Sequence, residues 1–376
     1  MKFLVVGYGR VGRAVALNLK AHGHQVEVVD IKVQRESFLD GFHVIDVSKD
    51  LGRVSKLATE FDCTCSCLPG RLGYRFMDAC AEHGIKLVDV SFTCEDPLSI
   101  DSKARKARST IIPDCGIAPG LTNMIVGLIS RVLDQIYEVE IKVGGLPLTP
   151  NPPLYHSSSW SIEDLLEEYA RPARYVEDGI LRSCDPLSFR TSIKIGDWDF
   201  EAFPSDGLRT LLRMKKRPSR LVELTLRWRG HLDVIKFLKD LGFLGEEKIE
   251  IGGINVTIRE LTAKILEKTM KYEPDVVVID VDVRGIMGKE PVKGCLMVYG
   301  SAFDENLSSM AKATGVVCSE VALLLSEGQI DCEGVIPPED LDNLELVVKR
   351  ILKKLKILGF RVENKGLDSL GLTLGS

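Results

Sequence analysis

Residues 5–12 read VVGYGRVG, an apolar run that leads directly into Gly7-x-Gly9-x-x-Gly12. An amphipathic helix is expected immediately afterwards, over residues 11–22. In such a strand–turn–helix unit the first glycine permits a tight turn, the second admits a phosphate, and the third lets helix and strand pack closely. The helix N-terminus adds N–H groups that favour an anion, so the stretch predicts a dinucleotide site rather than a bare glycine-rich turn. The residues of this predicted site are Gly7, Gly9, Arg10, Val11 and Gly12.

A carboxylate closes the second apolar run, QVEVVD, at Asp30, where Rossmann units hold the adenosine ribose. An acid there repels a 2′-phosphate and therefore favours NAD over NADP. Lys32 and Arg35 follow closely, and their charges weaken that preference. Asp46 ends the third run and either lies near the adenine or is an ordinary exposed aspartate.

Strand and helix signals alternate over about the first 120 residues, which is typical of βαβ units and a parallel sheet. Ligands bind at the carboxyl ends of such strands. CLPGRLG, residues 67–73, follows the fourth run, and DVSF, residues 89–92, ends the fifth. Each segment either lines the nicotinamide end of the cofactor or is a plain strand-to-helix turn. The cofactor-binding residues expected from them are Leu68, Pro69, Gly70 and Asp89.

The pattern changes after Gly120, where several runs alternate with the period of two that half-buried strands show. Helical periodicity returns from about Ser308. The sequence thus predicts an α/β protein with a Rossmann-type doubly wound parallel sheet over residues 1–122. A second, largely antiparallel α+β domain is expected over residues 123–307, followed by C-terminal helices over residues 308–376.

Composition sets limits on partners and compartment. The net charge of −5 gives no bulk attraction to nucleic acid or anionic lipid, and no run approaches the ~20 apolar residues of a membrane span. The basic helix predicted over residues 347–358 fits a surface helix better than a membrane or RNA contact. Cys63, Cys65 and Cys67 share one face of a strand, as buried thiols rather than metal ligands do. We expect no metal, and a reducing, cytoplasmic location without an export signal.

The spelling GYGRVG resembles NAD-binding regulatory domains of ion channels, which would make the protein a sensor without turnover. Five later stretches, in order, instead resemble the saccharopine dehydrogenase family over essentially the whole chain. They are DCGIAPGLTN (114–123), VGGLPLTPNPPLYHSSSWS (143–161), FEAFPSDGLRT (200–210), TLRWRGH (225–231) and GVIPPEDL (334–341). The resemblance implies that the middle domain binds substrate and forms a homodimer, and that the C-terminal helices return to the Rossmann domain.

Within that family the chain is most similar to the L-lysine 6-dehydrogenases. It has PGLTN where saccharopine-splitting relatives have an acid and a histidine, and it ends the arginine strand in Gly230-His231. It departs from the pattern at Arg229, where relatives usually have proline. The resemblance implies NAD-dependent oxidative deamination of the ε-amine of L-lysine. Reductive condensation to saccharopine or to a carboxylated polyamine is the alternative within the family.

Oxidation of an amine requires loss of its proton, a carbon placed at the nicotinamide, and a grip on the distant carboxylate. Arg227 is the expected carboxylate clamp, unless it is an outward-facing strand arginine. His231 is the expected general base, unless it is structural. Asp114 either pairs with the amine and orients water or caps a helix.

Four further residues complete the predicted substrate site. Asp206 with Arg209 is expected to face the amine, and Tyr155 with Trp160 to line the aliphatic stem. Trp160 fits a core position equally well. His156 is a polar residue where an aromatic or apolar one would be less surprising.

Overall fold

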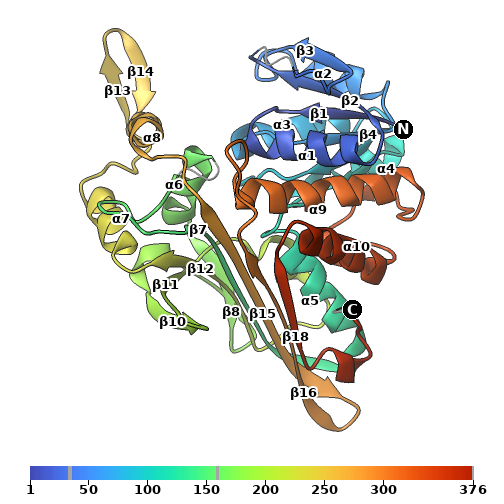
Figure 1. The fold of residues 1–376 in the computed structure, drawn as a ribbon, viewed down its shortest axis with the longest axis vertical. Coiled ribbons are helices and arrows are strands. Elements are labelled where there is room, and N and C mark those ends of the chain that lie inside the picture. The colour runs from blue at the N-terminus through green and yellow to red at the C-terminus, as the bar shows by residue number, and fades with distance from the viewer. Residues whose placement is uncertain (33–35, 158–160, 375–376) are drawn as a thin grey trace. The chain divides into compact units, whose positions relative to one another are not determined.

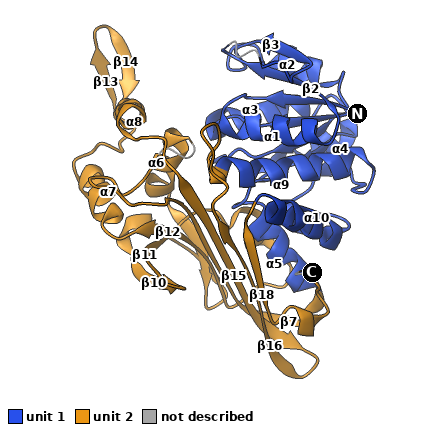
Figure 2. Cartoon of the chain, in the orientation of Figure 1, with its two compact units in different colours: residues 1–131, 311–358, 376 blue, residues 132–310, 359–375 orange. Residues whose placement is uncertain are grey.

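The structure is a computed structural model that describes residues 1–32, 36–157 and 161–374. The chain forms two compact units, coloured separately in Figure 2. Unit 1 consists of Met1–Arg131 and Ala311–Leu358, and unit 2 consists of Val132–Met310 and Gly359–Gly375.

Unit 1 contains a seven-stranded, wholly parallel sheet in the order β17-β6-β5-β4-β1-β2-β3. Its strands are β1 (Lys2–Val6), β2 (Gln25–Asp30), β3 (Gly41–Val44), β4 (Cys63–Ser66), β5 (Lys86–Asp89), β6 (Thr110–Ile112) and β17 (Gly334–Val335). Its helices are α1 (Arg10–Ala21), α2 (Leu51–Ala58), α3 (Gly70–Cys80), α4 (Asp101–Ala107), α5 (Leu121–Val132), α9 (Ser309–Ser326) and α10 (Leu344–Ile357). This order confirms the predicted doubly wound Rossmann-type sheet.

The core of unit 1 follows from its apolar strands. The side chains of Phe3–Val6 are fully buried, and each such residue contributes about 1.5–3 kcal/mol on burial. Cys63 and Cys65 are buried on β4 and Cys67 is partly buried just after it. All ten cysteines are free thiols.

Two C-terminal helices pack in unit 1, and α9 runs alongside α1 in Figure 1. A Cβ at Gly315 would lie 2.7 Å from Ala14 Cβ, so glycine permits this close helix contact. Among the described residues α9 alone is long and apolar enough to cross a membrane, although no such stretch was expected. Core helices have the same composition, and 78% of its window is buried. The apolar face of α10 is also buried, which leaves its basic residues as the polar face.

Unit 2 is built on a nine-stranded mixed sheet whose main path is β10-β11-β12-β7-β15-β16-β18, and only β12 and β7 pair in parallel. Its strands are β7 (Gln135–Pro147), β8 (Ala173–Glu177), β9 (Ile180–Cys184), β10 (Thr191–Ile195), β11 (Trp198–Pro204), β12 (Arg220–Trp228), β15 (Asp275–Met287), β16 (Glu290–Gly300) and β18 (Arg361–Lys365). A separate hairpin joins β13 (Lys248–Ile251) to β14 (Ile254–Thr257). The helices are α6 (Ile162–Ala170), α7 (His231–Asp240) and α8 (Ile258–Thr269). The predicted antiparallel α+β domain is confirmed, and Figure 1 shows its long strands side by side.

The end of the chain differs from the expectation of helices that return to the first domain. Residues 311–358 do belong to unit 1, but Gly359–Gly375 belongs to unit 2. The reason is β18, which pairs antiparallel with β16 through five residue pairs and so extends the sheet of unit 2.

Candidate functional site

The glycine loop between β1 and α1 has the geometry that close backbone approach requires. Gly7 has a φ of +89°, and a Cβ there would lie 2.6 Å from the Cys67 carbonyl oxygen. A Cβ at Gly12 would lie 1.9 Å from the Gly7 carbonyl oxygen. Gly9 precedes α1 as its N-cap, and its Cβ position has no atom within 4 Å. Arg10 and Val11 begin the helix. These residues fit a dinucleotide pyrophosphate, which needs free backbone N–H groups and open space at that turn.

Two carboxylates lie beside this loop. Asp30 accepts hydrogen bonds from the backbone N–H of Tyr8 (2.7 Å) and of Lys32 (3.0 Å). Glu36 binds Arg13 through two hydrogen bonds of 2.7 and 2.8 Å and accepts a third from the Tyr8 hydroxyl at 3.0 Å. Burial raises the pKa of Tyr8, so that hydroxyl stays protonated. Glu36 was not predicted, because nothing in its sequence neighbourhood identifies its distant partners.

Asp46 closes a local turn. Its carboxylate accepts hydrogen bonds from the backbone N–H (3.1 Å) and hydroxyl (2.6 Å) of Ser48 and pairs with Lys49. These contacts, the Ser48 hydroxyl first, lower the pKa of the Asp46 carboxyl. They are contacts of an ordinary turn aspartate, which is one of the two alternatives predicted for this residue.

The ends of β4 and β5 meet at the carboxyl edge of the sheet. Leu68 packs in the core, Pro69 is the N-cap of α3, and Gly70 is its buried first residue. The Ser91 hydroxyl lies 2.9 Å from the Leu68 carbonyl oxygen and 3.0 Å from Asp89 Oδ2. The Ser91 backbone N–H donates to Asp89 Oδ1 at 2.8 Å.

Asp89 and Asp114 form a buried acidic pair at this edge. Burial raises the pKa of Asp89 to about 6, the charge of Asp114 adds to the rise, and the hydrogen bonds from Ser91 oppose it. Asp114 is 1% exposed and has a φ of +53°. Because α5 begins at Leu121, Asp114 is not the N-cap residue of that helix.

Arg227 is buried in unit 2 and already has partners. It is 2% exposed, so the alternative of an outward-facing arginine is wrong. Its Nε donates to the Tyr169 hydroxyl at 2.7 Å, its Nη1 to the Leu226 carbonyl oxygen at 2.9 Å, and its Nη2 to Glu168. The predicted carboxylate clamp is therefore occupied by carboxylate and phenol groups of the chain itself.

His231 is 1% exposed, and both of its ring nitrogens are engaged. Nδ1 lies 2.5 Å from the Leu154 carbonyl oxygen, which can only accept, so we assign the proton to Nδ1. Nε2 then accepts from the Tyr169 hydroxyl at 2.7 Å. Burial, followed by the charge of Arg227, lowers the pKa of His231 to about 3. At neutral pH the imidazole is neutral with no free nitrogen, which argues against the predicted role of general base.

The second group of predicted substrate residues is divided. Asp206 is buried and binds Arg174 through hydrogen bonds of 2.7 and 2.9 Å. Arg209 is also buried, with a φ of +51°. Tyr155 packs against Gly230, where a Cβ would lie 3.0 Å from the tyrosine ring. Trp160 lies outside the described residues.

Arg229 does not add charge to this cluster. Its side chain is 57% exposed and forms two hydrogen bonds of 2.9 Å with Asp199 on the neighbouring strand β11. The departure from the family pattern at Arg229 therefore leaves its charge in an exposed ion pair on the sheet.

The structure adds Glu223, Glu168, Tyr169 and His156 to the cluster. Glu223 and Arg227 are on the same face of β12, and the period-two alternation of RLVELTLRW contains that signal. His156 lies edge-on to His231 with ring centroids 5.1 Å apart. No short motif indicates Glu168 or Tyr169, because α6 contacts β12 only through the tertiary fold.

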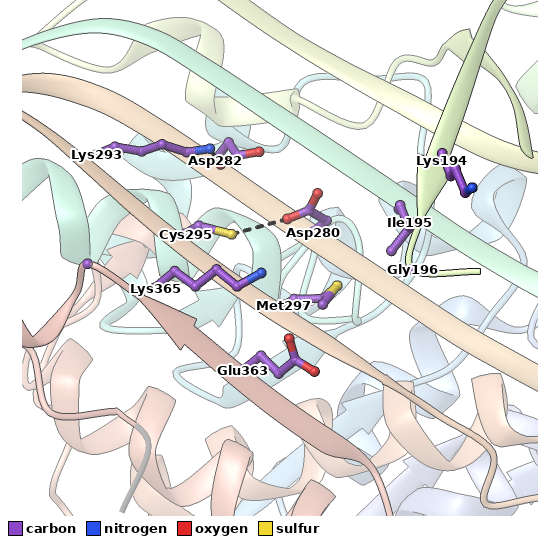
Figure 3. A pocket seen from close by; sticks show the side chains of 11 residues that line it. Lys194, Ile195, Gly196, Asp280, Asp282, Lys293, Cys295, Met297, Glu363 and Lys365 are labelled. Atoms are coloured by element: carbon purple, nitrogen blue, oxygen red, sulfur yellow. Dashed lines mark hydrogen bonds and ion pairs between the residues drawn. The ribbon is translucent and has the colours of Figure 1, made fainter. Parts of the chain in front are cut away.

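A separate cavity of about 460 Å³ opens on the sheet of unit 2 (Figure 3). Asp280, Asp282 and Cys295 lie there with ligand atoms within 4.8 Å of one another. Lys142 contacts both aspartates at 3.0 and 3.2 Å, and Lys293 contacts Asp282 at 2.6 Å. The Cys295 thiol donates to Asp280 at 3.3 Å, and burial raises its pKa to about 12. Both aspartates of this group are thus paired with lysines.

Unit 1 thus presents a glycine loop that fits a dinucleotide, and unit 2 contains a buried charged cluster. Residues 3–112 match the model of the saccharopine dehydrogenase NADP binding domain. Residues 116–360 match that of the saccharopine dehydrogenase C-terminal domain. The chain belongs to the saccharopine dehydrogenase family, and the predicted family is confirmed.

Individual relatives are distant but extend over most of the chain. The chain is 22% identical to saccharopine dehydrogenase [NADP(+), L-glutamate-forming] of Schizosaccharomyces pombe, across 89% of this chain and 91% of that protein. It is 25% identical to mitochondrial alpha-aminoadipic semialdehyde synthase of Bos taurus, across 65% of this chain and 29% of that protein. Apo saccharopine dehydrogenase (L-Glu forming) from Saccharomyces cerevisiae has the same fold, with a TM-score of 0.74, 18% identity, and coverage of 97% and 99% of the two chains.

Proposed function

We propose that this protein is a nicotinamide-dependent dehydrogenase that oxidises the ε-amine of L-lysine. With water as the second reactant, which hydrolyses the imine, the products would be ammonia, 2-aminoadipate 6-semialdehyde, the reduced cofactor and a proton. The observation that carries the proposal is the buried cluster of unit 2, where arginines and carboxyls lie in one connected set. A zwitterionic head group requires both signs of charge at fixed positions, and such a site holds the far end of the substrate.

We propose NAD as the cofactor. Asp30 and Glu36 place two negative charges beside the glycine loop, and Glu36 also engages Arg13. Both features disfavour a 2′-phosphate. The domain model and the Schizosaccharomyces pombe relative instead carry NADP in their names, so both cofactors belong in the test.

A bound nicotinamide would accept hydride from the carbon that carries the amine. The protein must hold that amine in its neutral form, and Asp114 is our candidate proton acceptor because it lies beside Asp89 at the carboxyl edge of the sheet. His231 is not proposed as the base, since both of its nitrogens are hydrogen-bonded. Its neutral ring instead fixes the Tyr169 hydroxyl and, through it, Arg227.

Saccharopine is the second candidate substrate, because the Schizosaccharomyces pombe relative is named for it. Formation of a carboxylated polyamine by reductive condensation follows as a related activity. A nucleotide sensor without turnover would have no use for the charged cluster of unit 2. We also propose that the protein is cytoplasmic, forms a homodimer, and has no nucleic-acid or membrane partner. Light scattering after gel filtration would test the homodimer.

The deciding experiment follows the absorbance of the reduced cofactor. Purified protein is mixed with NAD or NADP and with lysine, ornithine, diamines, polyamines or saccharopine. We expect lysine-dependent reduction of NAD with one ammonia released per turnover. Turnover of saccharopine alone would establish the second candidate, and cofactor binding without any turnover would establish the sensor.

A further inference from the structure

Glu223 on β12 has a buried carboxyl group, and one of its two oxygens has no hydrogen-bond partner. It is 3% exposed. Its Oε1 accepts a hydrogen bond from the Ser205 hydroxyl at 3.0 Å, and the backbone N–H of Gly207 also donates to the carboxylate. Oε2 has no hydrogen-bond partner, and the side chain forms no ion pair with any described residue. A buried carboxyl oxygen without a hydrogen-bond partner is energetically costly, so the unpartnered Oε2 requires an explanation.

The two neighbouring carboxyls, unlike Glu223, each form an ion pair with an arginine. Glu168 pairs with Arg227, and Asp206 pairs with Arg174. Burial raises the pKa of Glu223 to about 8, and the charges of Glu168 and Asp206 add to the rise, while hydrogen bonds from Ser205 and Gly207 oppose it. At neutral pH Glu223 is therefore mostly protonated in the free protein. A bound cation would stabilise the ionised carboxylate, so the proton would be lost on binding.

Other buried polar atoms of unit 2 also lack partners among the described residues. They are both ring nitrogens of His156, the hydroxyl of Ser157 and the hydroxyl of Thr210. Burial, followed by the charge of Arg227, lowers the pKa of His156, so its ring is neutral and has one N–H to donate. A Cβ at Gly207 would lie 1.8 Å from Glu223 Oε1, so only glycine allows the carboxyl this position.

We propose that Glu223 binds the α-ammonium group of the amino-acid substrate through Oε2. The inference rests on the function proposed above and identifies the head group that this unit recognises. The α-ammonium is the suitable partner because it remains charged throughout the reaction. The ε-amine must lose its proton before hydride transfer, and a carboxylate beside it would stabilise the unreactive ammonium form. The N–H of His156 is then available to the α-carboxylate.

This arrangement predicts a proton released on binding. On binding, the Glu223 carboxyl loses its proton to the solvent. The resulting carboxylate then accepts a charge-assisted hydrogen bond from the ammonium. With a pKa of about 8 in the free protein, about 0.9 proton should be released per lysine at pH 7. The affinity for lysine should accordingly rise about tenfold per pH unit from pH 6 to pH 7.5.

The test uses titration calorimetry on the full chain saturated with reduced cofactor, which allows binding without turnover. Measurement in two buffers of different ionisation heat gives the number of protons released. The ligands are L-lysine and 6-aminohexanoate, which keeps the carboxylate and the ε-amine but has no α-ammonium. Wild type should prefer lysine, whereas Glu223→Gln should lose roughly 10–100-fold in lysine affinity, release no proton, and bind 6-aminohexanoate as wild type does. Glu177→Gln, an exposed carboxyl of the same unit, is the matched control.

The outcomes separate this inference from the proposed function. Turnover of lysine by wild type, with lysine preference and proton release unchanged in Glu223→Gln, would overturn the ammonium site and leave the dehydrogenase intact. Binding of lysine with proton release that depends on Glu223, but no turnover of any amine, would support the site and refute the activity. If Glu223→Gln did not fold, the pH dependence and proton release of wild type would still decide the matter, since absence of both contradicts the proposal.

Discussion

Replacement of Tyr169 by phenylalanine should reveal how much the buried network of unit 2 contributes to stability. The hydroxyl accepts a hydrogen bond from Arg227 Nε and donates one to His231 Nε2, both at 2.7 Å. Both partners are at most 2% exposed, so water cannot replace the lost group. The phenyl ring would keep its packing against Phe203, whose centroid lies 5.2 Å away. The substitution therefore removes hydrogen bonds without opening a cavity.

The expected cost follows from the two orphaned groups. A buried donor or acceptor left without a partner costs about 1–3 kcal/mol, so two give roughly 2–6 kcal/mol. Arg227 keeps its contacts with Glu168 and with the Leu226 carbonyl oxygen, which limits the loss on that side. We expect Tyr169→Phe to lower the free energy of unfolding by roughly 2–4 kcal/mol.

Guanidinium unfolding followed by tryptophan fluorescence measures this change in the relevant unit. All three tryptophans of the chain lie within residues 132–310 and so report on unit 2. Tyr175→Phe is the matched control, because its partly buried hydroxyl has no hydrogen-bond partner among the described residues. It should change stability by less than about 0.5 kcal/mol. A Tyr169→Phe protein as stable as this control would refute the hydrogen-bonded network.

Three further predictions concern unit 1, and a fourth concerns its thiols. Gly12→Ala should weaken cofactor binding at least roughly tenfold in a fluorescence titration, because the new Cβ would lie 1.9 Å from a backbone oxygen, whereas Gly52→Ala, with nothing within 4 Å, should not. Asp30→Ser should shift the ratio of kcat/KM values for NAD and NADP roughly tenfold toward NADP, and an unchanged ratio would remove Asp30 from the ribose site. Asp89 has a folded-state pKa of about 6, above its ordinary value, so the folded state binds more protons than the unfolded state between pH 4 and 6. The stability of the wild type should therefore fall by up to about 3 kcal/mol as the pH rises through that window. Asp89→Asn should flatten this part of the pH profile. Under native conditions a thiol reagent should label Cys94 first, as an exposed cysteine, and mass spectrometry of the labelled peptides would show any other order.

The glycine loop could be predicted because its constraints are local. Gly7 and Gly12 are required by backbone atoms a few residues away or on the adjacent strand, and the spacing of the motif carries that information. The position of Asp30 follows in the same way, since β2 lies beside β1 in register. Glu36 could not be predicted, because its contacts with Arg13 and Tyr8 depend on how the loop after β2 folds back.

The chemistry of unit 2 was harder to predict for a physical reason. The alternation of β12 indicates that Arg227 and Glu223 share a face, but it does not reveal what packs on that face. Glu168 and Tyr169 come from α6, more than fifty positions earlier, and they determine that Arg227 is a network residue rather than a free clamp. The Gly-His pattern also does not indicate that His231 is buried, although burial is the largest cause of the low pKa of His231.

The three carboxyls of this network argue for a division of roles within it. Glu168 and Asp206 each face an arginine, and each pair fixes the position of both side chains. Glu223 has a hydroxyl donor on Oε1 and no hydrogen-bond partner on Oε2. A third arginine would have stabilised the empty protein, but it would also have closed the position to an ammonium ligand. An acid kept neutral by burial costs less in the free protein than an unpaired charge, and it becomes an anion when a cation arrives. The two matched pairs therefore set the geometry, and the unmatched acid responds to the substrate.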